Sequence, residues 1–369
     1  MKILLLQDHL RSGGTERQTV LLADAFARAG HTVRLLTLRP GGPLASSLGA
    51  GVEHRALQPF DTHLDWFAPG LQGADAGFGP DIVLCMGRIA NCYAGGLQAR
   101  LPKAAVIATM RTGKSLPAKF RASLATVRHI VANSAEARDH LGEAYDVARE
   151  RVTVIHNSLV FPPSGNLGAA RHDELRRTFG AKPDTTVLAC VAMFRREKNQ
   201  RELIEIVAGL PADLDWQLWL AGEGPELAAC TTLAAQRGLT ARVKFPGWLA
   251  DPTPLYAAAD LAVHASWSES LSNFLIEAQA RGLPAVAYEA QGIAECFLPG
   301  ETGWVIPRDD QAAFRQAVVK LARATPAERQ ALAARASAFA RESFDPARQV
   351  QAYLDLFGRL TGDAAASRA

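Results

Sequence analysis

Short apolar runs recur along the whole chain and are separated by segments with helical periodicity or by loops. Runs rich in Val, Ile, Leu and Ala are typical of strands that are buried on both faces of a parallel sheet. The first half contains seven such runs, at residues 2–6, 31–38, 52–57, 82–86, 105–110, 130–132 and 152–155. The second half contains six, at residues 187–193, 217–221, 243–245, 261–265, 285–288 and 303–306. Strands that alternate with helices in this way predict an α/β protein with two doubly wound sheets.

The boundary between the two series falls at residues 161–166, which read FPPSGN. Prolines and small polar residues end all periodicity there, which indicates a linker. A chain of 369 residues is long enough for two domains of ordinary size. We therefore expect a first domain at residues 1–163 and a second at residues 164–345.

The end of the chain is rich in Ala, Arg and Gln, and its pattern predicts helices over residues 311–357. The dipeptide Asp345-Pro346 breaks them. The segment 346–369 is expected to form a last helix that crosses back to the first domain. In two doubly wound domains that face one another, ligands are expected where the carboxyl ends of the strands meet the cleft.

The first strand is followed by a glycine loop and a helix. Gly13 and Gly14 stand in this loop, and the helical pattern begins at Glu16 and ends at Gly30. Glycines let the backbone approach a phosphate or a sugar closely, and the start of a helix offers free N–H donors. Taken alone, such a turn has a steric explanation, because tight connections between strand and helix often use glycine.

The stretch at residues 263–287 holds a second loop of this kind. A buried strand leads into a polar loop at residues 266–273, and a helix follows at residues 274–281. Ser272 and Asn273 provide the cap signal, and Gly282 stands just past the helix. The partial positive charge of the helix start suits an anionic ligand.

Two glutamates frame this loop and helix. Glu269 lies in the loop, Glu277 lies about one turn into the helix, and seven residues separate them. Carboxylates at such a site are acceptors for hydroxyl groups on either side of an anion, as in ribose, phosphate and sugar. The alternative is a pair of solvated glutamates, which most isolated pairs of this spacing are.

Cations follow the first strand of the second domain. Arg195 and Lys198 would lie at the mouth of the cleft, where a pair of cations suits a diphosphate. The alternative is a solvated run of charges in a loop.

Several of these features together resemble a known family. They are the Glu269-x7-Glu277 pair, Gly282-Leu283-Pro284, Gly300-Glu301-Thr302-Gly303 and the Gly13-Gly14-Thr15-Glu16-Arg17 loop. This set is similar to the retaining GT-B glycosyltransferases of family 4, also called glycosyl transferases group 1. Ser270 departs from the pattern, since most members have glycine after the first glutamate. The resemblance spans nearly the whole chain and implies two Rossmann-like domains, the first for the acceptor and the second for the nucleotide sugar.

The resemblance also implies roles in the second domain. Glu277 would hold the ribose hydroxyls, and Lys198 and Arg195 would neutralise the diphosphate. Arg195 is the nearest substitute for a family arginine whose position here is Met193. Glu269 would hold the donor sugar together with the backbone of Ser270, Leu271, Ser272 and Asn273. The nucleoside pocket would be lined by Gly222, Gly247 and Trp248.

In the first domain the resemblance implies two further contacts. Gly13 and Gly14 would face the ligand, with the Gly14 backbone at the diphosphate. Arg111 ends the fifth strand, where many relatives have a histidine that touches the donor or the reaction centre. Arginine cannot act as a base there, but it can bind an anion or a hydroxyl.

Other polar residues are interpreted as structural. Asp213-Leu214-Asp215 has the spelling of a metal-binding motif, but it follows Pro211 and reads as a turn, so no metal is predicted. His9, His31 and His264 have no carboxylate partner at a recognisable spacing. Asp260 is expected only to cap a helix.

Composition narrows the class of protein. Hydrophobic residues make up 48% and charged residues 21%, as in soluble globular proteins, and the net charge of +3 does not indicate nucleic acid. The 5 cysteines are scattered without a C-x-x-C pair, which favours a reducing compartment and gives no zinc motif. The apolar run at residues 3–6 is too short for a signal peptide. A cytoplasmic protein is expected.

Positive charge is concentrated in one part of the first domain. Residues 100–135 contain seven Lys and Arg residues and no acid. Three explanations remain open: a solvated basic face, contact with an anionic membrane surface, and binding of an acidic acceptor.

The expected reaction is transfer of a sugar, with retained anomeric configuration and without a metal or other cofactor, from a nucleotide sugar to a hydroxyl. A UDP-sugar is the expected donor and a glycan or lipid-linked molecule the expected acceptor, as in the synthesis of cell-surface polysaccharide or glycolipid. Two alternatives are a GT-B sugar-nucleotide epimerase and a catalytically inactive nucleotide-binding relative.

Overall fold

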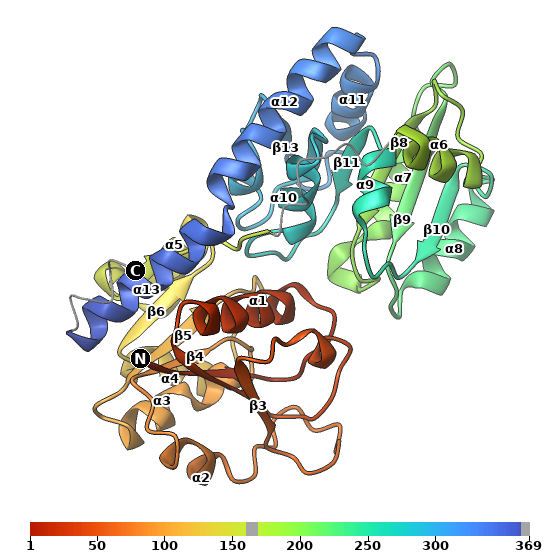
Figure 1. Cartoon of the computed structure of the whole chain (residues 1–369). Coiled ribbons are helices and arrows are strands. Elements are labelled where there is room, and N and C mark those ends of the chain that lie inside the picture. The colour runs from red at the N-terminus through yellow and green to blue at the C-terminus, as the bar shows by residue number, and fades with distance from the viewer. Residues whose placement is uncertain (160–168, 363–369) are drawn as a thin grey trace. The chain divides into compact units, whose positions relative to one another are not determined.

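A computed structural model describes residues 1–159 and 169–362, apart from the side chains of residues 75, 76 and 169–173. The chain forms two compact units (Figure 1). Unit 1 consists of Met1–Ser158 and Pro346–Ala369, and unit 2 consists of Leu159–Asp345. The linker predicted at residues 161–166 lies outside the described residues.

Unit 1 contains a sheet of seven parallel strands in the order β3-β2-β1-β4-β5-β6-β7. The strands are β1 (Lys2–Gln7), β2 (Thr32–Thr37), β3 (Val52–Ala56), β4 (Ile82–Cys85), β5 (Ala105–Met110), β6 (His129–Ala132) and β7 (Val152–Val154). They fall on the seven apolar runs, so this part of the predicted fold is confirmed.

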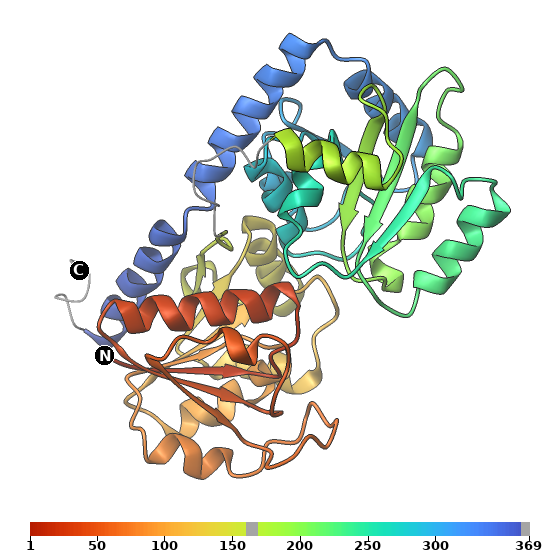
Figure 2. The same cartoon turned by 45° about the vertical axis from the view of Figure 1, so that its right-hand side comes forward.

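The helices of unit 1 cover both faces of its sheet (Figure 2). They are α1 (Gly14–Arg28), α2 (Leu71–Ala76), α3 (Ala90–Arg100), α4 (Ala118–Thr126), α5 (Ala135–Tyr145) and α13 (Pro346–Thr361). Successive residues of β1 point to opposite faces. Leu4 and Leu6 join the apolar cluster that contains α2 to α5, whereas Ile3 and Leu5 join the cluster that contains α1 and α13.

Helix α13 is anchored in unit 1 by rings and by buried amides. Phe26 of α1 packs on Phe357 with 5.4 Å between ring centroids. The Gln349 side-chain amide donates to the Gln18 Oε1 at 3.0 Å and to the His156 carbonyl at 2.7 Å. The Ser158 hydroxyl donates to the Gln349 Oε1 at 2.6 Å. These contacts tie α13 to the segment that follows β7.

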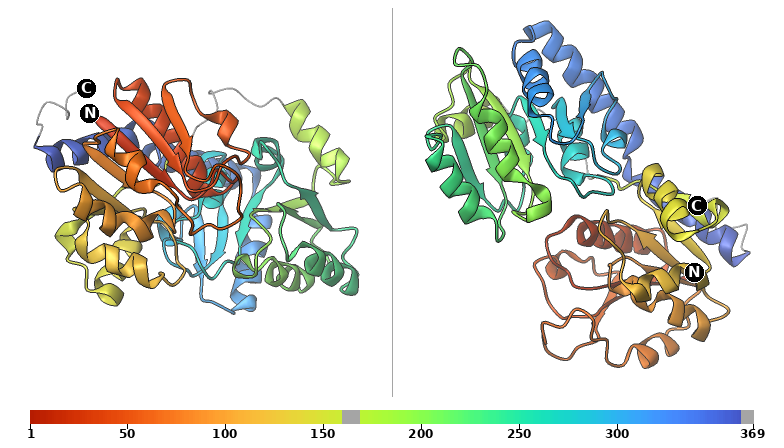
Figure 3. Two further views of the ribbon diagram at one scale, coloured as in Figure 1. Left: turned by 90° about the horizontal axis from the view of Figure 1, so that it is seen from below. Right: turned by 180° about the vertical axis from the view of Figure 1, so that it is seen from behind.

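Unit 2 contains six parallel strands in the order β10-β9-β8-β11-β12-β13. They are β8 (Thr186–Val191), β9 (Trp216–Ala221), β10 (Val243–Gly247), β11 (Leu261–His264), β12 (Ala285–Tyr288) and β13 (Gly303–Ile306), which confirms the six predicted runs. The helices, on both faces (Figure 3), are α6 (Ala169–Thr178), α7 (Gln200–Ala208), α8 (Leu227–Gln236), α9 (Thr253–Ala258), α10 (Asn273–Ala280), α11 (Gln311–Ala322) and α12 (Pro326–Ser343).

The helical end of the chain has one break more than predicted. Besides the break at Asp345, α11 ends at Ala322 and α12 begins at Pro326. Thr325 and Glu328 form a capping box, in which each side chain accepts a hydrogen bond from the other residue's backbone N–H. None of the helices in the described part of the chain combines the length and the apolar character that crossing a bilayer requires.

Candidate functional site

The carboxyl edge of the unit 2 sheet gathers most of the residues that the sequence pointed to. Arg195 and Lys198 follow β8, Gly222 follows β9, and Glu269 follows β11. All strands of this sheet are parallel, so the segments that follow them emerge at one edge, where ligands of doubly wound domains bind.

Helix α10 begins at this edge with a formed cap. Ser272 is the N-cap, and its hydroxyl oxygen accepts the backbone N–H of Leu275, as the cap signal predicted. The preceding residues Ser270 and Leu271 are buried, so the loop is packed and not a solvated turn. The first turn of α10 contains no acid that would neutralise its partial positive charge.

Glu269 is buried in this loop between two basic side chains. Its Oε1 lies 2.5 Å from the Lys198 Nζ and 2.7 Å from the His264 Nε2, and 9% of its side chain is exposed. Burial alone would raise the pKa of this carboxyl, but the Lys198 ammonium and the His264 hydrogen bond outweigh it and lower the pKa to about 2. Glu269 is therefore a buried carboxylate at neutral pH.

The expectation that His264 has no carboxylate partner is wrong. The chain turns back after β11, and this brings Glu269 onto the imidazole of the last strand residue. His264 is 1% exposed, and its ring packs on Phe274 with 5.6 Å between centroids. Because a carboxylate only accepts, the His264 Nε2 donates; its buried Nδ1 has no partner among the described residues.

Lys198 and Glu269 were predicted to serve different parts of a donor, but in the structure they contact each other. Lys198 ends a short 3-10 turn at Arg196–Lys198, and Asn199 follows with a left-handed φ of 53° as the N-cap of α7. The Arg195 guanidinium, just before this turn, makes no ion pair within the described part of the chain. Met193, at the position of the family arginine, is exposed.

Glu277 lies in the second turn of α10 and accepts the hydroxyl of Tyr256 at 2.6 Å. Tyr256 belongs to α9 and is 2% exposed. Nothing in the sequence spacing marked Tyr256 as the partner of Glu277. The hydrogen bond orients the Glu277 carboxylate.

The backbone is packed so closely after β9 that two positions there require glycine. Gly222 has a φ of 139°, and a Cβ there would lie 2.1 Å from the Ala192 carbonyl oxygen. Gly224 has a φ of 148°, and a Cβ would lie 2.3 Å from the Phe194 carbonyl oxygen. The loops after β8 and β9 therefore touch backbone to backbone. Gly247 accepts the Gly222 N–H at 2.8 Å through its carbonyl, and the next residue, Trp248, is exposed.

In unit 1, Gly13 is the N-cap of α1 and Gly14 its first residue. The carboxylate of Glu16 folds back over Gly13, so that a Cβ on Gly13 would meet the Glu16 Oε2 at 2.5 Å. Gly14 is exposed.

Arg111 follows β5 in unit 1 and is engaged on both of its amino groups. One donates to the Asn157 Oδ1 at 2.5 Å and the other to the Tyr353 hydroxyl at 2.6 Å. These bonds join β5, the segment after β7 and α13. Arg111 therefore has a structural role in unit 1. Its contact with a donor remains a prediction.

Comparison with known proteins identifies the family. The family model described as Glycosyltransferase Family 4 matches residues 12–159, and the model described as Glycosyl transferases group 1 matches residues 185–324. The chain belongs to glycosyltransferase family 4. The two matches cover more than half of the chain, one in each unit.

Individual curated glycosyltransferases are also similar to this family 4 chain. It is 34% identical over 138 residues to the lipopolysaccharide core biosynthesis glycosyltransferase LpsE of Rhizobium meliloti (strain 1021), covering 37% of this chain and 40% of that protein. It is 28% identical over 355 residues to the GDP-mannose-dependent alpha-mannosyltransferase of Mycolicibacterium smegmatis, covering 89% of each. Several of the matched curated relatives, including LpsE, are thus covered over only about two fifths of their length.

Solved structures confirm the GT-B fold predicted for this family 4 chain. Anabaena Alr3699/HepE, crystallised with UDP-glucose, has a TM-score of 0.81 and 22% identity, covering 97% of this chain and 100% of that one. WaaG, a glycosyltransferase involved in lipopolysaccharide biosynthesis, has a TM-score of 0.76 and 19% identity, covering 98% and 100%.

The D-x-D sequence lies at the other edge of the unit 2 sheet, just before β9. Asp213 pairs with Arg323 at 2.8 Å, and Asp215 accepts the Thr185 hydroxyl at 2.9 Å. Within residues 1–159 and 169–362, no three His, Cys, Asp or Glu side chains are grouped as metal ligands would be.

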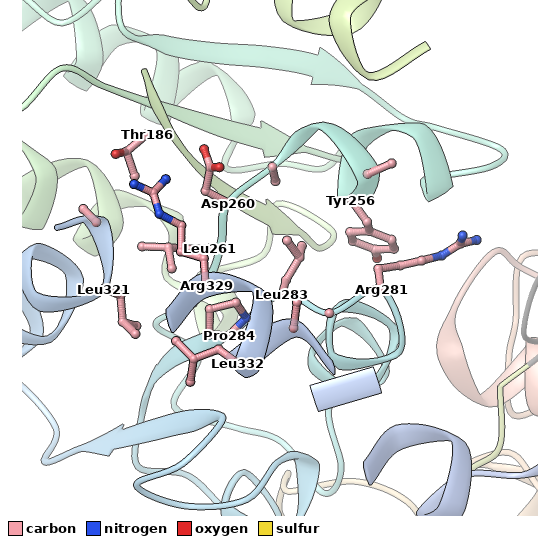
Figure 4. A pocket seen from close by; sticks show the side chains of 15 residues that line it. Thr186, Tyr256, Asp260, Leu261, Arg281, Leu283, Pro284, Leu321, Arg329 and Leu332 are labelled. Carbon is pink, nitrogen blue, oxygen red and sulfur yellow. The ribbon is translucent and has the colours of Figure 1, made fainter. Parts of the chain in front are cut away.

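A pocket of about 200 Å³ also lies at this amino edge (Figure 4). Its lining includes Thr186 and Leu261, which start β8 and β11, and Pro284, which precedes β12. It therefore lies away from the carboxyl edge that holds Glu269. Asp260, also in this lining, was expected only to cap a helix, but its Oδ2 accepts the Val187 N–H at 2.7 Å and pairs with Arg176 at 3.2 Å.

Proposed function

We propose that the protein is a glycosyltransferase that transfers a sugar from a nucleotide sugar to a hydroxyl acceptor with retained anomeric configuration. The observation that carries this proposal is the arrangement around the start of α10. A buried, ionised Glu269 with Lys198 lies on one side of the helix start, and Glu277 lies on the helix itself. This arrangement offers positive charge for a diphosphate and carboxylates for hydroxyl groups on both sides of it.

Glu269 would receive the donor sugar. Both of its contacts fall on Oε1, so Oε2 is the oxygen that can accept a sugar hydroxyl. His264 holds the carboxylate in place through its Nε2. A fixed acceptor orients the sugar without spending binding energy on ordering the side chain.

Lys198 would act on the leaving diphosphate, together with Arg195 and the start of α10. Negative charge grows on the diphosphate as its bond to the sugar breaks, so a cation placed there stabilises the transition state more than the ground state. Lys198 has a partly exposed side chain, which allows its ammonium to contact a phosphate while Glu269 keeps the His264 hydrogen bond. The proton of the acceptor hydroxyl would go to the leaving phosphate, as in the family, and no metal would be required.

Glu277 would accept the ribose hydroxyls, with its carboxylate oriented by the Tyr256 hydroxyl. A uridine nucleotide is the proposed donor, since the similar structure of HepE contains UDP-glucose. A guanosine nucleotide is the competing choice, since a similar mannosyltransferase is GDP-mannose-dependent. The proposed acceptor is a glycan or lipid-linked hydroxyl in cell-surface polysaccharide or glycolipid synthesis, as the name of LpsE suggests for that relative.

The protein is proposed to work in the cytoplasm with peripheral contact to the membrane through part of the basic stretch. The topology of unit 1 divides this stretch. Arg100 and Lys103 precede β5 and Arg128 precedes β6, so they lie at the amino edge of the sheet. Lys114 and Lys119 follow β5 and lie at the carboxyl edge. Only a part of the seven cations can meet one flat surface.

The test is to incubate the protein with UDP-sugars and GDP-sugars, first alone and then with glycan and lipid-linked acceptors. Release of nucleoside diphosphate that depends on the acceptor supports a transferase. Interconversion of the free nucleotide sugar without release would show a GT-B epimerase instead. Binding of a nucleotide sugar, seen as a rise in melting temperature, without either reaction would show an inactive relative.

A further inference from the structure

A loop in unit 1 exposes large apolar side chains. It joins β3 to α2 (Figure 1) and contains Phe60, Leu64, Trp66 and Phe67, which are 69%, 42%, 64% and 38% exposed. Three other large hydrophobic side chains in the described residues are as exposed, and all three are scattered in unit 2. We call residues 60–67 the aromatic loop. Concentrated exposure of this kind marks an interaction surface.

Buried polar groups hold the aromatic loop in one conformation. Gln58 is 1% exposed, and its side-chain amide donates to the carbonyls of Leu64 at 2.9 Å and Phe67 at 2.6 Å. The Thr62 hydroxyl donates to the Gln58 Oε1 at 2.7 Å. The Tyr93 hydroxyl donates to the Trp66 carbonyl.

Ion pairs also hold the loop. The Arg39 guanidinium, with 8% of its side chain exposed, contacts Asp61 at 2.8 Å and Asp65 at 2.7 Å. Arg11 contacts Asp65 at 2.8 Å. The His63 Nδ1 lies 3.0 Å from the Arg39 Nη2. Arginines thus neutralise both carboxylates of the loop, whereas its large rings are left exposed to solvent, the reverse of what burial of apolar surface would produce.

We propose that the aromatic loop docks unit 1 on an anionic lipid bilayer, with Phe60, Trp66 and Phe67 in the interfacial region. Tryptophan and phenylalanine partition into this region, where the rings leave water. A sugar would need polar partners beside the rings, but Asp61 and Asp65 are already paired with arginines. The observed surface thus fits lipid better than glycan.

Charge near the loop favours an anionic surface. Residues 82–135 contain eight Lys and Arg residues and no Asp or Glu. Three of these cations, Arg88, Lys114 and Lys119, follow β4 or β5 and are exposed at the carboxyl edge, the edge at which the aromatic loop leaves β3. Tyr93 of α3 connects the loop to this region, because α3 packs against α4, which carries Lys119. Binding at a membrane interface strengthens with the apolar area that is buried and with electrostatic attraction to anionic lipids, and this region offers both.

Docking through the aromatic loop extends the membrane contact proposed above. The vesicle test uses no nucleotide sugar, so its result does not depend on the transferase activity. The full chain is co-sedimented with vesicles of phosphatidylcholine alone and of phosphatidylcholine with phosphatidylglycerol. We expect binding to the anionic vesicles, and the Phe60→Ser/Trp66→Ser variant should bind at least about tenfold more weakly, since two large exposed rings leave the interface. Lys119→Glu should weaken binding about fivefold or more at low salt and much less at high salt.

The matched control is Trp248→Ser, which removes an exposed tryptophan from unit 2 and should leave vesicle binding unchanged. Circular dichroism must show the same melting temperature for each variant. Wild-type protein that ignores anionic vesicles, or a folded double variant that binds them as well as wild type, overturns the inference. A wild-type dimer in sedimentation velocity that the double variant abolishes would instead make the loop a protein interface. An unchanged vesicle affinity with a raised acceptor KM would make it an acceptor platform.

Discussion

Replacing Lys198 by methionine should show how much the ion pair between Lys198 and Glu269 stabilises unit 2. The substitution keeps most of the length of the side chain and removes the charge, so that the buried Glu269 carboxylate retains only the His264 hydrogen bond. The pKa of Glu269 falls from an ordinary 4.5 to about 2 in the folded protein, which corresponds to roughly 3 kcal/mol of stability at neutral pH. The attraction of the Lys198 ammonium is the largest single cause that lowers this pKa.

We therefore expect Lys198→Met to lower the free energy of unfolding of unit 2 at pH 7 by about 3 kcal/mol, within the range for breaking a buried pair. Adding Glu269→Gln should recover most of the loss, since no buried charge is then left alone. The sign with pH follows from the lowered pKa. The stabilisation is complete above about pH 4.5 and is lost as the pH falls toward 2, so wild type and Lys198→Met should converge there.

Urea unfolding followed by tryptophan fluorescence is the assay. It reports mainly on unit 2, which contains Trp216, Trp219, Trp248, Trp267 and Trp304, whereas unit 1 contains Trp66. Lys182→Met is the control, because Lys182 is 75% exposed and lies 3.9 Å from Asp215. It should change stability by less than about 1 kcal/mol. The two side chains are not paired in solution if Lys198→Met lowers the free energy of unfolding no more than this control does and its effect simply adds to that of Glu269→Gln.

Three further outcomes follow from the site. Glu269→Gln should leave the affinity for UDP nearly intact while turnover falls steeply, and equal loss of both in calorimetry and rate assays would place Glu269 on the nucleotide or in the fold. Arg195→Ala should slow the chemical step; if it changes nothing and Met193→Arg raises the rate, Arg195 does not replace the family arginine. EDTA should leave the rate unchanged, and a strict need for a divalent ion would return Asp213 and Asp215 to consideration.

Much of the fold was readable from the sequence because buried parallel strands are uniformly apolar. All thirteen strands in the described part of the chain fall on predicted runs, and Ser272 caps α10 as its position before the helix predicted. The break before α12 was missed although Thr325 and Glu328 have the spacing of a capping box. An alanine-rich pattern continues across that break, so periodicity alone did not reveal it.

The contacts within the site were not readable, since they join residues that are distant in the sequence or on irregular backbone. Lys198 and Glu269 are 71 residues apart, and Tyr256 and Glu277 are 21 apart. The His264 contact depends on how the loop after β11 turns back, which no spacing rule describes. The residue types of the site could therefore be predicted from the sequence, whereas the contacts between them depend on the fold.

The proposed donor site at the start of α10 is tested by the affinity for UDP of wild type, Glu277→Ala, Glu277→Gln and a control, Glu301→Ala, in titration calorimetry. Glu301 lies before β13, at the opposite edge of the unit 2 sheet, and pairs with Arg335 at 3.0 Å. Loss of charged hydrogen bonds to the ribose, at about 1.5–3 kcal/mol each, should weaken UDP binding to Glu277→Ala by about ten- to a hundred-fold. Glu277→Gln keeps an oxygen for the Tyr256 hydroxyl and separates the loss of charge from disturbance of the fold. We expect Glu301→Ala to match wild type; a Glu277→Ala variant that binds UDP as tightly as wild type would contradict the assignment.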